Sequence, residues 1–388
     1  MASTDAGLAG VLAAREIVIT CGSGGVGKTT TAGALAAMAA AEQGGRVLVL
    51  TIDPARRLAT ALGLEAFGNQ EVRIPDAAWA AAGTRPRGEL WAAMLDTKAS
   101  WDDLVRLHAP DDATRDAILD NPLYRNITGK FVQSHDYIAM ERLHEIHSSG
   151  RYDLVVVDTP PTRNAIDFLE APERMADFFS SRLLRWLIAP SRSRVVSAAS
   201  KPFYTVADRI LGSQFLEDIA EFFILFQSMY DGFVARAEAV TRLLRDPRTA
   251  FVVVSTLEPG PSREASFFID ELEARDLLLG AVVLNKVLPN ALLDPAGSEL
   301  ARVLSTSSTD VAERIADDPD DARTLGRVLR EVGDSFANFA VVAQREAEQR
   351  GALARRAGVV GAVPHLDEDV ADLGGLLRVG HALWPATG

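Results

Sequence analysis

One stretch near the start of the chain constrains the fold more than any other. Residues 22–29 read Gly-Ser-Gly-Gly-Val-Gly-Lys-Thr, a complete match to the phosphate-binding pattern G-x-x-x-x-G-K-[ST]. The stretch follows a β-branched run at residues 17–20 and precedes an alanine-rich run at residues 29–41. A strand, a glycine-rich turn and a helix in this order aim backbone N–H groups and the positive end of the helix dipole at phosphate oxygens.

The pattern predicts a role for each of its polar side chains. Lys28 is expected to contact the β- and γ-phosphates of a nucleotide, and the Thr29 hydroxyl is expected to ligate Mg²⁺. A glycine-rich turn without a ligand is the alternative, but such a turn has no need of Lys-Thr after its last glycine. We therefore expect a nucleotide to bind at Gly22, Ser23, Gly24, Gly25, Val26, Gly27, Lys28, Thr29 and Thr30.

Other apolar runs have the length of a strand. They lie at residues 46–52, 90–95, 152–157, 251–255, 281–284 and 359–363. Continuous apolar runs are typical of parallel strands buried on both faces, and these runs alternate with helical stretches. The sequence therefore predicts an α/β fold with a doubly wound, mostly parallel sheet of the P-loop NTPase type.

Two aspartates follow predicted strands, where ligands bind in open α/β sheets. Asp158 has the form of a Walker B aspartate and is expected to hold Mg²⁺ through water. Asp53 lies beyond the second predicted strand, where a carboxylate can reach the water that attacks the γ-phosphate. The alternatives are a helix cap for Asp158 and an Asp-Pro turn for Asp53.

Two further residues are candidates for contact with the base. Residues 285–288 begin like the guanine-reading sequence N-K-x-D, but Leu288 at the fourth position cannot accept hydrogen bonds from guanine. Asn285 can still bond an adenine edge, which favours ATP over GTP. Pro364 follows the last predicted strand, and its segment is expected to close over the base.

The charge and the cysteine content restrict the classes of partner. The chain has 388 residues and a net charge of −13, so its overall field repels nucleic acid and anionic membrane surfaces. Cys21 is the single cysteine, which leaves no disulfide framework and favours a reducing cytoplasm. No apolar run is long enough to cross a bilayer, and the N-terminus lacks the features of a signal peptide. We expect a soluble cytoplasmic protein that does not bind nucleic acid.

Two long stretches without a strand pattern, residues 100–148 and 172–245, are expected to form a helical subdomain within a single domain of residues 1–388. The second stretch carries a stripe of apolar residues at spacings of three and four. The stripe comprises Phe215, Ile219, Phe222, Phe223, Phe226, Met229, Tyr230 and Phe233, and Ile224 and Leu225 extend the apolar surface beyond it. Core packing and a groove for an apolar client or lipid are both open.

The last third of the chain has two contrasting stretches. Residues 290–321 are rich in Pro, Ser, Thr and Asp, which predicts a loop or mobile segment. Residues 322–356 predict a long charged helix.

Several of these motifs together resemble the ArsA-type ATPases, a family that includes the arsenite-pump ATPase and the ATPase that targets tail-anchored membrane proteins. The resemblance rests on residues 22–29, Asp53-Pro54-Ala55, the Asp158-Thr159-Pro160-Pro161-Thr162 loop, Phe168-Leu169 and Pro172, and it covers nearly the whole chain. It implies a deviant-Walker P-loop ATPase of the SIMIBI class that binds ATP and Mg²⁺. The family works as a dimer in which two nucleotides face each other. By position, the resemblance implies that Asp53 in switch I orients the hydrolytic water, that switch II follows Asp158, and that Asn285 contacts adenine.

The chain departs from the family pattern at three places. Ser23 stands where the family has a signature lysine that crosses the dimer interface to the partner's phosphates. Arg56 occupies the position where the family has a switch I histidine. Arg163 and Asn164 occupy positions in switch II where the family has a glycine and a histidine. No C-x-x-C is present to hold an inter-subunit zinc, and no cysteine cluster is present to bind arsenite. These departures argue against arsenite transport and against zinc-clasped tail-anchor targeting.

The missing lysine raises the question of which group supplies its charge. A paralogous ArsA-like subunit that retains the lysine could pair with this chain as a heterodimer. Alternatively, Arg56, Arg57 or Arg163 replaces the lysine within a homodimer. The third alternative is that nucleotide binding, rather than fast hydrolysis, is the output.

The sequence favours a Mg²⁺-dependent ATPase whose nucleotide state switches a dimer and is coupled to an apolar client or a membrane-associated partner. A regulatory nucleotide-binding subunit with little intrinsic hydrolysis, paired with a paralogous ATPase, is the alternative. A partition-type ATPase that uses DNA as its matrix is a third candidate, against which the acidic balance argues.

Overall fold

The computed structural model describes residues 7–52, 57–64, 68–125, 132–159, 170–171, 174, 177, 222, 224–225 and 229–384. In this part of the chain the strands form an eight-stranded sheet in the order β3-β4-β2-β5-β1-β6-β7-β8. Every neighbouring pair is parallel except β3 and β4. The sheet confirms the predicted α/β fold with a mostly parallel sheet.

The strands are β1 (Ile17–Cys21), β2 (Arg46–Thr51), β3 (Val72–Arg73), β4 (Glu89–Met94), β5 (Leu154–Asp158), β6 (Thr249–Ser255), β7 (Leu279–Val287) and β8 (Val360–Pro364). All but β3 coincide with the predicted runs to within a few residues. Strand β3 escaped prediction because two residues carry no alternation pattern, and it forms the antiparallel edge of the sheet.

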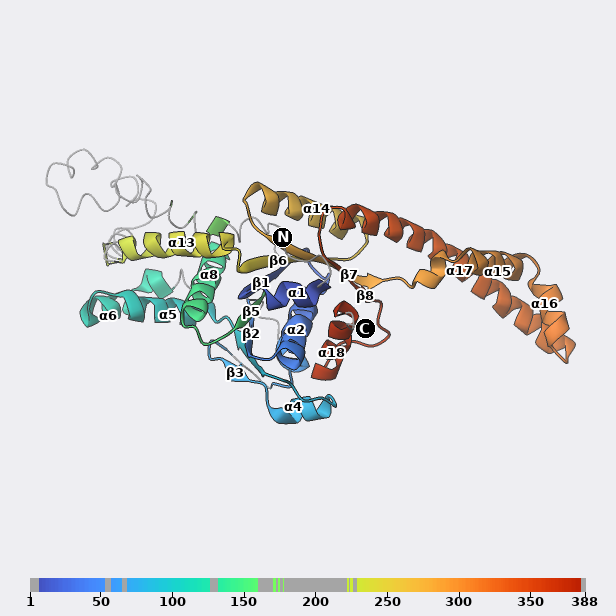
Figure 1. Cartoon of the computed structure of the whole chain (residues 1–388), viewed down its shortest axis with the longest axis horizontal. Coiled ribbons are helices and arrows are strands. Elements are labelled where there is room, and N and C mark those ends of the chain that lie inside the picture. Colours follow the sequence, from blue (N-terminus) through green and yellow to red (C-terminus); the bar gives the residue numbers. More distant parts are fainter. Residues whose placement is uncertain are drawn as a thin grey trace.

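The central strands are buried on both faces. In β2, Leu48 and Leu50 belong to one hydrophobic cluster, and Val47 and Val49 belong to the other. Helices α1 (Gly7–Ala13), α2 (Lys28–Met38) and α18 (Leu373–Leu383) cover one face, and α8 (Val132–Ser148), α13 (Tyr230–Arg245) and α14 (Pro259–Ala274) cover the other (Figure 1). This layering explains why these strands are apolar at successive positions.

Helix α2 is built from small residues that lie close to the sheet. Its alanines are buried throughout, and it continues through a π-helical turn, Ala39–Gln43, before β2. Short helices α3 (Arg57–Ala61) and α4 (Asp76–Ala81) follow between β2 and β4. The alanine-rich run therefore forms the helix that the phosphate-binding pattern requires.

Residues 290–321 are not a loop, contrary to the sequence prediction. They form a 3₁₀ turn (Asn290–Leu293), α15 (Pro295–Thr306), α16 (Ser308–Ile315) and the start of α17 (Pro319–Ala354). The polar residues that suggested a loop are helix starts: Asp294 and Asp318 cap α15 and α17, and each is followed by proline at the first helical position.

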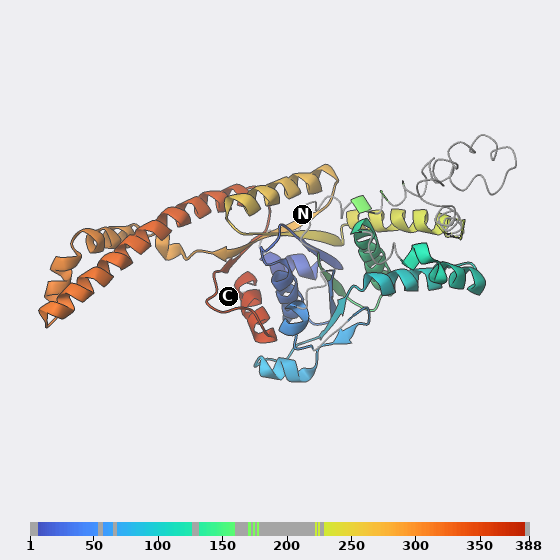
Figure 2. The same cartoon turned by 180° about the vertical axis from the view of Figure 1, so that it is seen from behind.

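The predicted long helix is confirmed. Helix α17 has 36 residues, and at 1.5 Å per residue it is about 54 Å long. With α15 and α16 it forms a helical arm, residues 290–354, that projects away from the sheet (Figures 1 and 2).

The described parts of residues 100–148 and 172–245 include α5 (Thr97–His108), α6 (Asp112–Asp120), α8 and α13, which lie at the end of the molecule opposite the arm (Figure 1). In the apolar stripe, Phe222, Met229 and Phe233 are buried in the core, where Phe233 packs against Trp101 and Tyr137. Ile224 is 41% exposed. The side chains of Phe215, Ile219, Phe223, Phe226 and Tyr230 lie outside the described residues.

Candidate functional site

The glycine-rich loop between β1 and α2 is packed too closely for any side chain at two of its positions. Gly22 has φ +148°, and a Cβ atom there would lie 2.1 Å from the Val254 carbonyl oxygen of β6. Gly27 has φ +95°, and a Cβ atom there would lie 2.2 Å from Nδ2 of Asn285. The loop is therefore a cradle held against the ends of two neighbouring strands, as phosphate binding through backbone N–H groups requires.

Lys28 is the first residue of α2 and is buried within the cradle. Its Nζ donates a hydrogen bond to the Ser23 carbonyl oxygen at 2.9 Å, across the loop. The Ser23 hydroxyl is also buried and has no hydrogen-bond partner among the described residues. The ammonium group thus lies inside the loop, where a phosphate would meet it.

Asp158 lies at the end of β5 and is fully buried. Its Oδ2 accepts a hydrogen bond from Thr51 Oγ1 at 2.9 Å, and its backbone carbonyl accepts from the Ile52 N–H. The next residue, Thr159, donates through Oγ1 to the Thr20 carbonyl at 2.8 Å. These bonds fasten the carboxyl ends of β1, β2 and β5 together beside the cradle, with a carboxylate at the centre.

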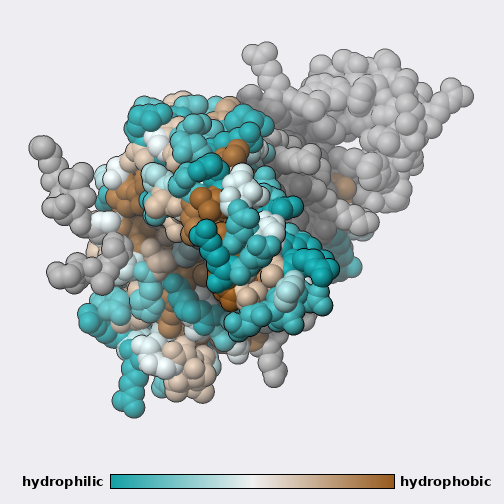
Figure 3. Space-filling view, turned by 90° about the vertical axis from the view of Figure 1, so that its right-hand side faces the viewer, coloured by the Kyte–Doolittle hydropathy of each residue, from teal (hydrophilic) through white to brown (hydrophobic). Residues whose placement is uncertain are grey.

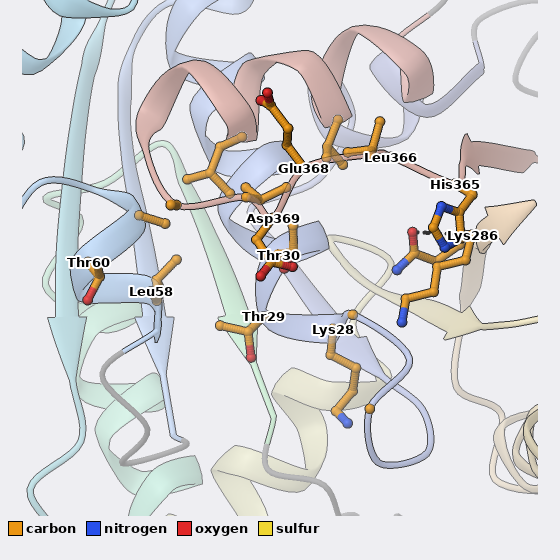
Figure 4. Close-up of a pocket in the computed structure, with 18 of the residues that line it drawn as sticks. Lys28, Thr29, Thr30, Leu58, Thr60, Lys286, His365, Leu366, Glu368 and Asp369 are labelled. Atoms are coloured by element: carbon orange, nitrogen blue, oxygen red, sulfur yellow. Dashed lines mark hydrogen bonds between the residues drawn. The ribbon is translucent and has the colours of Figure 1, made fainter.

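A pocket of about 1220 Å³ opens beside the cradle. Its lining includes Gly24, Gly25, Gly27, Lys28, Thr29, Thr30, Leu58, Thr60, Ala61, Thr159, Asn285, Lys286, Pro364, His365, Leu366, Glu368, Asp369, Val370, Ala371, Leu376 and Val379. The segment after β8, with Leu366 and Glu368, lies across the pocket from Lys28 (Figure 4). Because β8 is parallel to β7, its carboxyl end reaches the same edge of the sheet as the cradle.

Asn285 joins the pocket wall to the cradle. Its Nδ2 donates to the Val26 carbonyl oxygen at 2.8 Å, and its Oδ1 accepts from the Lys286 N–H at 2.9 Å. The strand is irregular here: the register between β7 and β8 shifts after Leu284, and Lys286 has φ 57°. An amide has two N–H groups and two lone pairs on its oxygen, so Asn285 keeps one of each for a base.

The structure brings most of the predicted nucleotide-binding residues to one pocket. Gly24, Gly25, Gly27, Lys28, Thr29, Thr30, Asn285 and Pro364 line it. The structure does not describe Asp53, Arg56, Arg163, Asn164 or the Arg57 side chain. The roles predicted for these residues therefore stay predictions.

Sequence reasoning missed the walls that α3 and α18 contribute. Leu58, Thr60 and Ala61 come from α3, and Leu376 and Val379 come from α18. No motif marks these residues. The segment from Leu366 to Ala371 could have been found, because it follows the last strand at its carboxyl end.

Cys21 ends β1 next to the cradle. Its thiol is buried and donates to the Val252 carbonyl oxygen at 3.5 Å. Burial raises the pKa of the Cys21 thiol well above its ordinary value, despite the opposing charge of Lys28. The group is therefore a protonated, packed thiol and not a nucleophile.

The geometry can be set beside known proteins. The family model of anion-transporting ATPases, the ArsA type, matches residues 15–303, which include the cradle, Asp158 and Asn285. The chain belongs to this ATPase family. Its P-loop nucleotide-binding fold is therefore the one that the sequence predicted.

Individual relatives agree with the family assignment. An uncharacterized protein of Streptomyces coelicolor is 31% identical over 298 residues, which cover 75% of this chain and 66% of the relative. An Aquifex aeolicus protein provisionally named arsenical pump-driving ATPase 2 is 24% identical, over 69% of this chain and 79% of its own. The ATPase GET3 of Kluyveromyces lactis is 27% identical over 40% of this chain and 44% of its own. The match thus spans a little under two thirds of the Streptomyces relative.

Among the described helices, none combines the length and the apolar character that a membrane span requires.

Proposed function

We propose that this ArsA-type chain is a Mg²⁺-dependent ATP hydrolase. The observation that carries the proposal is a large pocket lined by the glycine cradle and Lys28, with the buried Asp158 carboxylate at the end of β5, the strand next to β1. The glycine-rich loop offers backbone N–H groups to phosphate oxygens, and the buried carboxylate of Asp158 suits a hydrated divalent cation.

Each residue of the site would have its own role in phosphoryl transfer. The cradle N–H groups and Lys28 would neutralise the phosphate oxygens, and Thr29 and Asp158 would hold Mg²⁺, Asp158 through water. When bound, Mg²⁺ supplies charge stabilisation at the phosphates. Asp53 would orient the attacking water, a role that rests on the family resemblance.

The base would lie between Asn285 and the segment that follows β8. Asn285 retains one N–H and one lone pair after its two hydrogen bonds within the chain, which suits an adenine edge. Pro364 and His365 line the same part of the pocket, and the His365 N–H is fixed by the Val287 carbonyl oxygen. This arrangement supports ATP as the nucleotide.

The output of the cycle is a switch between two states of a dimer. We propose that the dimer is coupled to an apolar client or a membrane-associated partner, and that arsenite transport and zinc-clasped targeting are not its functions. The partner subunit is either a second copy or a paralogue that carries the signature lysine absent at Ser23.

A second candidate is a regulatory subunit that binds ATP with little hydrolysis of its own. Ser23 favours it, since a serine hydroxyl cannot replace a cationic group that stabilises the transition state from across the interface.

The decisive experiment measures Mg²⁺-dependent ATP hydrolysis by the full chain, alone and with paralogous subunits. Lys28→Ala and Asp158→Asn should each lower the rate by at least about 100-fold, because each removes a charge at the phosphates or the cation. Lys98→Ala is the matched control, since Lys98 is exposed and pairs with Asp102 on α5. Equal rates for wild type and Lys28→Ala would refute hydrolysis at this site. Tight ATP binding with negligible hydrolysis under every partner condition would favour the regulatory subunit.

A further inference from the structure

The helical arm is inserted between two neighbouring strands of the sheet. Strand β7 ends at Val287 and β8 begins at Val360, and residues 290–354 between them form the arm. The two strands are parallel partners, and Asn285 of β7 and Pro364 of β8 both line the nucleotide pocket. The arm therefore starts within a few residues of the amide that is expected to contact the base.

Three residues on one face of α17 attach the arm to the body of the protein. Glu346 Oε2 accepts a hydrogen bond from the Leu288 N–H at 3.0 Å. Gln349 Oε1 accepts a hydrogen bond from Ser262 Oγ of α14 at 3.0 Å. Leu353 is buried in the hydrophobic core. Spacings of three and four residues place Glu346, Gln349 and Leu353 on the same face of the helix, and we call these three residues the root of the arm.

Beyond its root, the described part of the arm extends away from the sheet (Figures 1 and 2). Figure 3 views the molecule from the side where the arm projects, and hydrophobic residues are exposed there between hydrophilic ones. Exposed apolar side chains of the arm include Ile315, Val332 and Phe339. The contacts at the root therefore set where the arm lies relative to the sheet.

The segment of β7 beside the root has an unusual backbone. Lys286 has φ 57°, in the left-handed region that is costly for any residue other than glycine. The pairing of β7 with β8 shifts its register between Leu284 and Val287. The Lys286 N–H donates to Asn285 Oδ1 at 2.9 Å, and Lys286 itself lines the pocket. Such a conformation persists only where the surrounding structure holds the chain on both sides of the residue.

Hydrogen bonds to other segments hold the backbone around Lys286. On its N-terminal side, Asn285 Nδ2 donates to the Val26 carbonyl oxygen of the cradle at 2.8 Å. On its C-terminal side, the Val287 carbonyl oxygen accepts from the His365 N–H at 3.1 Å, which fastens the segment to the chain after β8. Both bonds come from walls of the nucleotide pocket itself.

The arm supplies a further bond on the C-terminal side. The Leu288 N–H lies beyond the last paired residue of β7, and Glu346 of α17 accepts its hydrogen bond. A carboxylate acceptor makes a stronger hydrogen bond than a neutral one. Glu346 therefore helps to hold Lys286 in its left-handed conformation from outside the pocket.

We propose that Glu346 is a positioning residue for the nucleotide base. It holds residues 285–288 in the conformation that presents Asn285 to the pocket, and it thereby couples nucleotide binding to the arm. This inference rests on the proposed nucleotide site. Neither Glu346 nor Leu288 is among the described residues that line the pocket, so Glu346 acts through the backbone and does not touch ATP. Because coupling between two sites is reciprocal, binding of the base also stabilises the root of the arm.

The other two residues of the root show what simple attachment of the arm looks like. Gln349 and Leu353 join α17 to α14 and to the core. Glu346 differs from them, because it bonds the backbone two residues from the left-handed Lys286. The contact of the arm with the base-binding segment is therefore made by Glu346.

Calorimetric titration of the full chain with the β,γ-imido analogue of ATP and with inorganic tripolyphosphate tests the positioning role. Glu346→Ala should weaken binding of the ATP analogue by at least about fivefold, because the hydrogen bond to the segment is lost. Its effect on tripolyphosphate should stay below about twofold, since that ligand has no base. Glu346→Gln should keep most of the affinity, because its amide oxygen can accept the same bond. Glu348→Ala is the matched control, since Glu348 is exposed on the same helix.

Hydrogen–deuterium exchange tests the coupling to the arm. In the ligand-free chain, Glu346→Ala should speed exchange in peptides that cover residues 285–288. In wild type, the ATP analogue should slow exchange in residues 340–350 of α17, whereas tripolyphosphate should not. Glu346→Ala should abolish this difference between the two ligands, because the contact that carries the coupling is gone.

Three outcomes would overturn the proposal. The first is a Glu346→Ala chain that binds the ATP analogue as tightly as wild type. The second is an equal loss of affinity for both ligands, which would make Glu346 a general structural contact. The third is unchanged exchange of residues 285–288 in the ligand-free Glu346→Ala chain. A wild-type chain that binds neither ligand would instead refute the proposed function, and exchange in the ligand-free chain would still decide whether Glu346 holds this segment.

Discussion

Asn285 has two neighbours with different chemistry, the cradle on one side and the open pocket on the other. Its amide already bonds the Val26 carbonyl oxygen, which holds the loop that carries Gly27. Loss of the side chain would therefore act on the cradle, on the base, or on both. At the scale of a single residue, the two roles can be separated by a ligand that has phosphates but no base.

We expect Asn285→Ala to weaken ATP binding by about 1–2 kcal/mol, since one hydrogen bond to a base and one to the loop are lost. Binding of inorganic tripolyphosphate should fall by less, because that ligand makes no base contact. Isothermal titration calorimetry of both ligands measures the difference. An equal loss for both ligands would assign Asn285 to the cradle alone and would remove it from base recognition.

At the scale of the helices, a buried ion pair joins α8 to α13. Glu141 of α8 pairs with Arg236 of α13, and Tyr137 Oη donates to Glu141 Oε2 at 3.2 Å. The Arg236 guanidinium also lies over the Phe233 ring, 4.8 Å from its centroid. Burial raises the pKa of Glu141 above its ordinary value, although Arg236 opposes this shift. The carboxylate therefore depends on Arg236 to stay charged.

Arg236→Met should lower the free energy of unfolding by about 3 kcal/mol, because it leaves a buried carboxylate without its counter-charge. The double variant Glu141→Gln/Arg236→Met should recover part of this loss, since no charge then remains buried. Urea unfolding followed by circular dichroism gives both values. A single variant as stable as wild type would show that water reaches the pair.

Two histidines, His108 on α5 and His144 on α8, predict a dependence of stability on pH. Burial is the main cause that holds the pKa of both histidines below the ordinary 6.5. The charge of Arg236 lowers the pKa of His108 further, and the charge of His147 does the same for His144. Below about pH 6.5 the unfolded chain then binds more protons than the folded chain, so stability falls as the pH falls through this range.

We expect the urea midpoint to decrease between pH 7 and pH 5.5, and to decrease less in the double variant His108→Gln/His144→Gln. Carboxylates titrate equally in both proteins, so the difference between the two slopes isolates the histidines. Identical slopes would mean that neither imidazole is held neutral by the fold.

At the scale of the whole molecule, we propose that Ser23 decides how two copies share a reaction. By the family resemblance, its buried hydroxyl occupies the position of a signature lysine that would reach the partner's nucleotide. A homodimer of this chain therefore lacks one cation for each nucleotide site unless another arginine supplies it.

We expect Ser23→Lys to raise the rate of ATP hydrolysis by at least about tenfold, because a cation at the transferring phosphate stabilises the transition state. Ser23→Met is the control for side-chain size without charge. Rates of ATP hydrolysis are compared at protein concentrations above and below the dissociation constant of the dimer. No gain in Ser23→Lys would indicate that Arg56, Arg57 or Arg163 already provides the charge.

Much of the fold could be predicted because its signals are local. The strands of the parallel sheet are continuous apolar runs, and the cradle is a motif of eight adjacent residues. The first part of the arm, residues 290–321, was predicted as a loop because Pro, Asp and Ser serve helix starts as well as turns, and composition does not separate the two uses.

The sequence by itself determined the mostly parallel sheet and the family, and it predicts the residues that hold phosphates, because each depends on neighbours along the chain. The tertiary structure alone decided what those residues contact: Lys28 with the Ser23 carbonyl, Asn285 with the cradle, and α3 and α18 as pocket walls. It also decided that α17 packs against α15 and α16 within the arm and reaches the core through Leu353. Such facts depend on how distant segments fold together, and no local pattern records them.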